Sequence, residues 1–198
     1  MNKKEFKLFN MKKLLIIIIP VFFLTYGCKV KKPLAETKPA MEQQSAEVST
    51  YLKYADQTTW LLGYFKREQL YRTPHCEWYL TGYDNYKPDT VVVKKLTVLG
   101  TDNIAIKIVM GTWCPDSRRE VPRFLHVLDL WKFPPERVTF IGVDDAKASP
   151  IGEYEGLGIQ RVPTFIFYRN NIETGRIVEN PVTSLEQDIV NILTRNEK

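Results

Sequence analysis

Residues Ile104 to Ser117 read IAIKIVMGTWCPDS, and this stretch decides the fold. Its first half is nearly continuously apolar, which is typical of a strand that is covered on both faces. Cys114 and Pro115 then open a segment, extending to Trp131, whose apolar residues fall on one helical stripe. The sequence therefore predicts a strand, a short turn and a helix, with a cysteine at the start of that helix.

Cys114 is expected to be the N-cap residue, with Pro115 as the first helical residue, where its missing N–H group costs nothing. The amides of Asp116 and Ser117 would then point back at the sulfur, and the helix dipole would favour the anionic thiolate. The Ser117 hydroxyl is a further candidate donor to that thiolate. These residues predict a nucleophilic cysteine.

The chain beyond this helix continues as an α/β pattern. Strand, helix and parallel strand imply a right-handed crossover, so we expect an α/β fold in which helices flank a mixed sheet. Thr183 and Glu186 have the spacing of a capping box at the start of the last helix. The other expected elements are a strand at 138–143, a short helix at 150–157 and a hairpin of 164–168 with 172–178.

The part of the chain before Ile104 predicts a helical extension. Apolar residues recur at helical spacing from Ala46 to Phe65, which favours an amphipathic helix. Thr73-Pro74 and residues 82–88 are turn-rich, and residues 89–96 favour another short helix.

The amino end has a basic start, an apolar run from Leu14 to Leu24 and then Gly27-Cys28. The apolar run is too short for a comfortable membrane span, and the pattern resembles a bacterial lipoprotein signal, in which the cysteine is acylated. This resemblance implies lipidation at Cys28, a lipid anchor in the membrane, and a location in the bacterial cell envelope facing the periplasm or the exterior. An uncleaved anchor helix is the alternative.

We accordingly divide the chain into four parts. The expected parts are a signal peptide at 1–27, a flexible tether at 28–45, a helical extension at 46–100 and the main α/β domain at 101–198.

The main domain resembles the thioredoxin superfamily over roughly residues 103–194. The features that carry the resemblance are the apolar strand that leads into Trp113-Cys114, Pro122 within the helix, and Val162-Pro163-Thr164 before the hairpin. The resemblance implies a cis peptide bond at Pro163, which would face Cys114 and help an extended substrate to dock. It also implies substrate-binding roles for Val162, Thr164 and Trp113, and it points to bacterial thioredoxin-like proteins with an added amino-terminal segment.

Two positions depart from the family pattern. Ser117 stands where the second cysteine of a Cys-x-x-Cys motif is usual, and Ile108 stands where the family often has a buried acid. Both changes affect the release of a bound substrate, so release is expected to need an external thiol or Cys76. Cys76 is therefore a candidate resolving thiol; a disulfide partner and a free, half-buried cysteine are the alternatives.

No metal or other cofactor is expected, because paired, short-spaced metal ligands are absent. Several aromatic residues of the extension either line a peptide groove or pack the extension against the main domain, and packing is the preferred interpretation. They are Trp60, Tyr64, Trp78, Tyr79 and Tyr83.

The charge distribution argues against nucleic acid as a partner. The chain of 198 residues has a net charge of +5, but the excess of lysine lies before Cys28 and the rest is nearly neutral. The first functional hypothesis is a membrane-tethered monothiol oxidoreductase or isomerase that acts on protein thiols or disulfides through Cys114. The second is a catalytically silent module that binds protein partners through the same groove.

Overall fold

The structure is a computed structural model, and it describes residues 56–195. The predicted signal peptide 1–27, the lipidation site Cys28, the tether 28–45 and the first part of the extension, residues 46–55, lie outside the described residues. Within 56–195, no helix is both long and apolar enough to cross a membrane.

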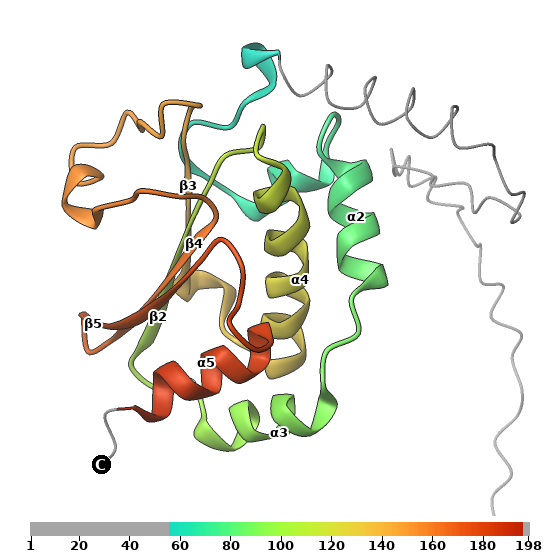
Figure 1. The fold of residues 1–198 in the computed structure, drawn as a ribbon, viewed down its shortest axis with the longest axis vertical. Helices are drawn as coiled ribbons and strands as arrows, with labels where there is room; N and C mark the ends of the chain where they lie inside the picture. The colour runs from blue at the N-terminus through green and yellow to red at the C-terminus, as the bar shows by residue number, and fades with distance from the viewer. Residues whose placement is uncertain (1–55, 196–198) are drawn as a thin grey trace, which may run out of the picture.

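A mixed five-stranded sheet forms the centre of the described chain (Figure 1). The strand order is β1-β3-β2-β4-β5; β2 runs parallel to β3, and β1, β4 and β5 each pair antiparallel with a neighbour. The strands are β1 Gly63–Phe65, β2 Ile104–Met110, β3 Val138–Gly142, β4 Thr164–Arg169 and β5 Ile172–Val178. The sequence predicted the α/β class, the central strand, its parallel neighbour and the hairpin, and all four are confirmed.

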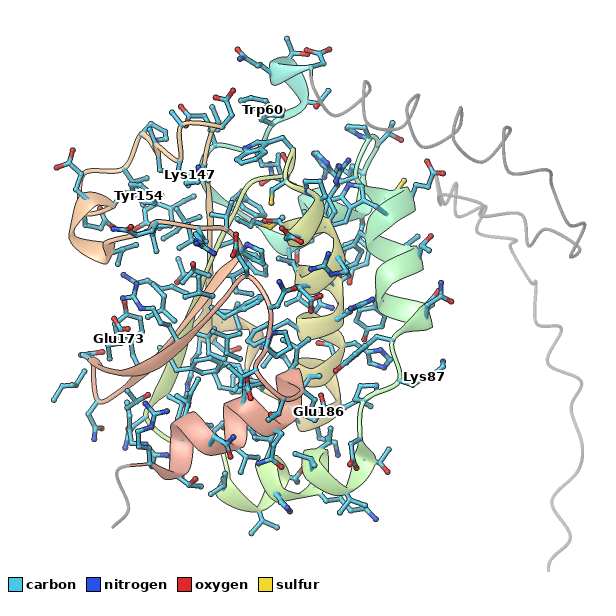
Figure 2. The ribbon with its side chains drawn as sticks, viewed as in Figure 1. Trp60, Lys87, Lys147, Tyr154, Glu173 and Glu186 are labelled. Atoms are coloured by element: carbon cyan, nitrogen blue, oxygen red, sulfur yellow. The ribbon has the colours of Figure 1, made fainter. Side chains whose placement is uncertain are left out.

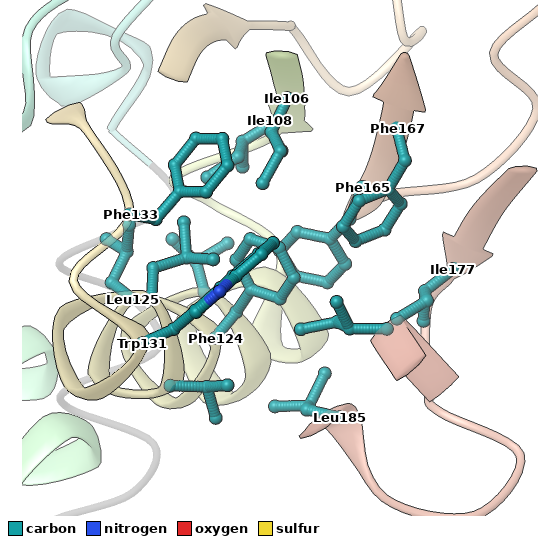
Figure 3. Packing of buried hydrophobic residues seen from close by; sticks show 14 of the residues in the cluster. Ile106, Ile108, Phe124, Leu125, Trp131, Phe133, Phe165, Phe167, Ile177 and Leu185 are labelled. Carbon is teal, nitrogen blue, oxygen red and sulfur yellow. The ribbon is translucent and has the colours of Figure 1, made fainter. Parts of the chain in front are cut away.

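The α-helices of the described chain all pack on one face of this sheet (Figure 1). Side chains from each helix join the residues of β2 and β4 that point to that face in one core. Figure 3 shows the part of this core that α4, the start of α5 and the strands form. The helices are α2 Cys76–Asn85, α3 Thr90–Leu99, α4 Pro115–Trp131 and α5 Leu185–Thr194. Short 3₁₀ turns occur at Gln57–Thr59, Arg67–Tyr71, Pro135–Arg137 and Glu155–Leu157.

The opposite face of the sheet is covered near one end by the chain between β3 and β4 (Figure 1). Tyr154 and Val162 pack there on Val109, Ile141 and Ile166 in a second, smaller cluster. The helix expected at 150–157 is reduced to the 3₁₀ turn at its end. Cys114 belongs to this second cluster, so loop segments rather than helices enclose it.

The helix expected over residues 46–65 is wrong for the described part. Residues 63–65 form β1, which pairs with the outer edge of β3. Pairing with β3 buries Phe65 and leaves Tyr64 exposed, an alternation with the period of a strand. Three-residue and four-residue spacing of apolar side chains did not reveal this pairing, because the partner strand lies far along the chain.

The turn expected at residues 82–88 is wrong for its first half, because α2 continues through Gly82 to Asn85, whereas residues 86–88 lie in the connection to α3 as expected. The glycine lies where α2 crosses α4, and a Cβ atom at that position would be 2.6 Å from Cγ of Pro122. Gly82 therefore serves close helix packing and does not mark a turn. The short helix expected near residues 89–96 is confirmed as α3, with Asp89 as its N-cap.

The capping box expected at Thr183 and Glu186 is wrong by one residue. Ser184 is the N-cap of α5, and its hydroxyl accepts a hydrogen bond from the Gln187 amide. Glu186 is buried and accepts hydrogen bonds from the Tyr86 hydroxyl at 2.9 Å and the Asp89 amide at 2.8 Å. It thus ties the start of α5 to the connection between α2 and α3 (Figure 2).

The contact at Gly82 gives a prediction for stability. Alanine favours a helix by about 1 kcal/mol over glycine, but overpacking costs about 1–3 kcal/mol, so we expect Gly82→Ala to lower the free energy of unfolding by about 1 kcal/mol. Denaturant unfolding measures this, with Gly152→Ala as the control because a Cβ there meets nothing within 4 Å. A more stable Gly82→Ala variant would contradict the packing argument.

Candidate functional site

Cys114 caps the N-terminus of α4, and Pro115 is the first residue of the helix, as the sequence predicts. Its backbone carbonyl already accepts the first helical hydrogen bond, from the Arg118 amide at 3.0 Å. The cysteine is a free thiol and is 6% exposed. The junction of β2 and α4 therefore holds a sulfur near the surface, with little of it open to solvent.

The thiol of Cys114 faces the loop before β4. Its Sγ atom donates a hydrogen bond to the carbonyl oxygen of Val162 at 3.3 Å, and the Val162-Pro163 peptide bond is cis. The Glu179 amide holds the loop by donating to the Pro163 carbonyl at 2.7 Å. The structure thus brings Val162 and Pro163 to the cysteine.

The side chain of Thr164, the first residue of β4, points back into the loop that precedes the strand. Its hydroxyl donates to the Arg161 carbonyl at 2.6 Å, and its side chain is buried. Thr164 therefore shapes the loop that faces Cys114, and a direct contact with substrate stays a prediction.

Ser117 is fully buried one turn into α4. Its oxygen accepts a hydrogen bond from the Gly111 amide at 3.4 Å, which ties the start of the helix to the end of β2. Cys114 accepts no capping hydrogen bond through its side chain, so the expectation that first-turn amides point at the sulfur is wrong for this structure. The sulfur is turned away to Val162 instead, and the role of Ser117 as a donor to the thiolate stays a prediction.

Trp113 lies across the end of the sheet toward β3. Its Nε1–H group donates to the Val143 carbonyl at 3.0 Å, and its ring covers Gly111 so closely that a Cβ atom there would be 2.5 Å away. The ring of Trp60 packs against it with centroids 6.1 Å apart (Figure 2). The indole therefore flanks Cys114 in a fixed position.

The charged side chains beside Cys114 on α4 compensate one another. Arg119 pairs with Asp116 at 2.8 Å and with the buried Glu120 at 2.7 Å, and Arg123 also reaches Glu120. In the loop before β4, Arg161 pairs with Glu179 at 2.8 Å. These pairs compensate the charges of Asp116, Glu120 and Glu179 on both sides of the sulfur.

Cys76, the candidate resolving thiol, is buried at the start of α2. Cys114 is a free thiol, so the two cysteines do not pair with each other in this structure. The role of Cys76 as a resolving thiol stays a prediction. Within residues 56–195, no three His, Cys, Asp or Glu side chains gather as a metal site would require.

His75 lies beside Cys76 and is 3% exposed. Burial lowers the pKa of its imidazole, and the nearby positive charge of Arg118 acts in the same direction, while a hydrogen bond with the Thr59 backbone opposes them. Its Nδ1 atom has no hydrogen-bond partner within the described residues. His75 is the N-cap of α2, and its hydrogen bond with the Thr59 backbone connects this helix to the first described residues.

The sequence missed most of the contacts that hold the turn before Cys114. The Leu61 amide donates to the Thr112 hydroxyl at 3.2 Å, across 51 positions of sequence. No local pattern signals such a pair, because each residue is ordinary for its own segment. Among the aromatic residues of the extension, Trp78, Tyr79 and Tyr83 pack with the main core as preferred, while Trp60 lies at the site.

The strand order, the helix that begins after Cys114 and the cis-proline beside its sulfur agree with the fold that the sequence resemblance implied. The fold is thioredoxin-like. It carries an amino-terminal extension, of which α2 and α3 are the described helices.

Comparison with solved structures finds similar chains at low identity. A protein of unknown function from Pseudomonas aeruginosa is 15% identical, with a TM-score of 0.42 over 62% of this chain and 81% of that chain. A thioredoxin mutant from Entamoeba histolytica is 24% identical, with a TM-score of 0.34 over 50% and 92% of the two chains. Thioredoxin from Trypanosoma brucei brucei is 22% identical, with a TM-score of 0.33 over 57% and 94%. No protein-family model matches the sequence, and no curated protein does.

The buried imidazole of His75 gives a prediction for pH dependence. Because its folded-state pKa lies below the ordinary value of 6.5, the unfolded chain binds more protons, and stability falls as the pH drops through and below that value. The loss reaches at most about 1.4 kcal/mol per pH unit, down to the folded-state pKa. Thermal unfolding of the wild type and His75→Gln between pH 7.5 and 5.5 checks this. Equal slopes for the two proteins would contradict it.

Proposed function

We propose that this chain is a thiol–disulfide oxidoreductase or isomerase of the thioredoxin superfamily that acts through the single cysteine Cys114. The observation that carries the proposal is the contact of 3.3 Å between its Sγ atom and the Val162 carbonyl, beside a cis-proline and at the start of a helix. The thiolate is the reactive form of cysteine, so the reaction proposed here requires the Cys114 thiol to lose its proton and leave its contact with the Val162 carbonyl.

The first step is attack on a substrate disulfide, R–S–S–R′. The Cys114 thiol gives its proton to solvent, its sulfur bonds to the R sulfur, and the R′ thiolate leaves and takes up a proton. The substrate disulfide is reduced at R′, and Cys114 becomes half of a mixed disulfide. No electrons are lost or gained overall in this exchange.

The second step needs a thiol from outside the motif. Ser117 cannot form a disulfide, Ile108 offers no proton acceptor, and Cys76 does not pair with Cys114 in this structure. An external thiol, R″–SH, attacks the R sulfur, gives up its proton and forms R–S–S–R″, while the Cys114 thiol is restored. When R″–SH belongs to the substrate protein itself, the result is disulfide isomerisation.

The loop before β4 supports a polypeptide substrate. The Val162 carbonyl faces Cys114, and the Val162 amide makes no hydrogen bond within residues 56–195. An extended chain that passes this loop would supply an acceptor for that amide in the manner of an added strand. Protein thiols and disulfides are therefore the substrate class we propose.

The location we propose is the bacterial cell envelope, with a lipid anchor at Cys28 facing the periplasm or the exterior. The support is the basic start, the apolar run and Gly27-Cys28 in the sequence. Metabolic labelling with a fatty acid tests this, because Cys28→Ser should lose the label and remain unprocessed. Retained label in Cys28→Ser would exclude this anchor.

One observation favours the second candidate, a catalytically silent binding module. Cys114 is only 6% exposed, and its thiol is engaged by Val162. A silent module would bind an extended partner at the same loop without forming a covalent bond. The two candidates differ in whether a disulfide forms at Cys114.

The deciding experiment mixes the reduced full chain, in detergent, with a peptide that carries a disulfide to a small thiol. We expect intact mass analysis to find a peptide adduct on Cys114 that dithiothreitol removes and that Cys114→Ser lacks. Binding of a reduced peptide with no adduct formed from its disulfide form would support the silent module and contradict the enzyme.

Ser117→Cys gives a second prediction. A thiol in place of the serine hydroxyl lies one helical turn from Cys114 and should expel the bound peptide by forming an internal disulfide with Cys114. We expect the adduct to accumulate in the wild type and to be short-lived in Ser117→Cys, with an internally oxidised protein as the product. Ser117→Ala is the matched control and should keep the adduct. An equally stable adduct in Ser117→Cys would contradict the assigned release defect.

A further inference from the structure

The first described residues of the extension lie against the end of the sheet that carries the site. Leu61 passes directly over Gly142 of β3, where a Cβ atom would be 1.9 Å from the Leu61 carbonyl oxygen. The Leu61 amide donates to the Thr112 hydroxyl, and Thr112 is almost fully buried. The segment is therefore fixed to the turn that leads into Cys114.

Trp60 contacts this turn through its ring. It packs on Trp113 at a centroid distance of 6.1 Å and an angle of 48° between the ring planes. Trp113 is held on its other side by the hydrogen bond to the Val143 carbonyl and by its contact with Gly111. Trp113 also packs against the small buried cluster, and the ring of Trp60 adds a contact from the extension.

The backbone around Trp60 is itself well ordered by local bonds. The Asp56 side chain accepts from the Thr58 amide at 2.9 Å and caps the 3₁₀ turn Gln57–Thr59. The Trp60 amide closes this turn by donating to the Gln57 carbonyl at 3.1 Å. The turn delivers the Trp60 ring to the site in a defined orientation.

We infer that Trp60 is a positioning residue for the redox site, acting on Cys114 through Trp113. By holding the Trp113 indole against Val143, it closes the β3 side of the sulfur and directs an extended substrate to the side of Val162. This inference rests on the proposed function. Its physical part, the restraint of Trp113, is independent of any reaction.

Loss of the Trp60 ring should therefore have opposite effects on the reactions of Cys114 with small and with large reagents. Without the Trp60 ring, the Trp113 indole is free to swing away, so a small alkylating agent gains a second route to the sulfur. A peptide disulfide loses the single defined approach beside Val162. An aromatic pair of this kind is worth about a two- to tenfold change in an equilibrium, which sets the expected size of both effects.

The test uses the full chain in detergent and compares Trp60→Ala, Trp60→Phe and Leu62→Ala with the wild type. Leu62 is the matched control because it is 47% exposed and lies in the same segment. We expect Trp60→Ala to raise the rate of Cys114 alkylation by iodoacetamide about two- to tenfold and to lower the rate of peptide adduct formation by a similar factor. Trp60→Phe should restore most of both rates, and Leu62→Ala should change neither.

A spectroscopic readout tests the restraint without any reaction. The Trp113 indole proton is hydrogen-bonded to Val143, so its exchange with solvent, followed by NMR, should accelerate in Trp60→Ala and not in Leu62→Ala. The inference would be overturned if indole exchange were unchanged in Trp60→Ala. It would also be overturned if the rates of Cys114 alkylation and of peptide adduct formation changed in the same direction by the same factor. If the wild type forms no peptide adduct, the proposed function fails, and the exchange and alkylation data still decide the role of Trp60.

Discussion

The antiparallel register of β2 with β4 is the constraint on which the site depends. Val109 lies opposite Thr164, so the turn after β2 and the loop before β4 emerge at the same end of the sheet. Cys114 therefore reaches the Val162 carbonyl although 48 positions separate the two residues. A slip of one residue would turn the side chains of the slipped strand to the opposite face of the sheet. The burial pattern that stabilises the core thus also fixes the geometry of the sulfur.

The site lies at the boundary between two unequal cores. The helix α4 packs in the large core on one face, while Cys114 belongs to the small cluster that the chain between β3 and β4 covers on the other. Connecting segments generally open more readily than packed helices. Cys114 is accordingly fixed on its helical side, and connecting segments form its cover on the other. A substrate can therefore reach the Cys114 sulfur when these connecting segments open, although the residue is only 6% exposed in this structure.

The sequence predicted the parts of the fold that local periodicity encodes. The run before Gly111, the stripe of α4 and the turn at 170–171 each specify an element within a few residues, and all formed where expected. The sequence predictions were wrong where contacts between residues far apart in the chain determine the secondary structure. Residues 63–65 form a strand because they pair with the free edge of β3. Gly82 lies within α2, and the contact with Pro122 explains why a glycine occupies that helical position. For the same reason the Leu61 contact left no sign in the sequence, and the preferred packing interpretation did not place Trp60 beside Trp113.

The two departures from the family motif have separate structural roles. Ile108 is fully buried in the large core, and Ser117 holds the turn by accepting from the Gly111 amide, so both positions support the scaffold around Cys114. Under the proposed function, release depends on a thiol that arrives from outside. With Trp113 held against Val143, we propose that this thiol enters beside Val162, on the same side as the substrate. A thiol of the substrate chain, or a small molecule, meets that steric requirement better than a second folded protein, and this favours isomerisation over reduction by a protein partner.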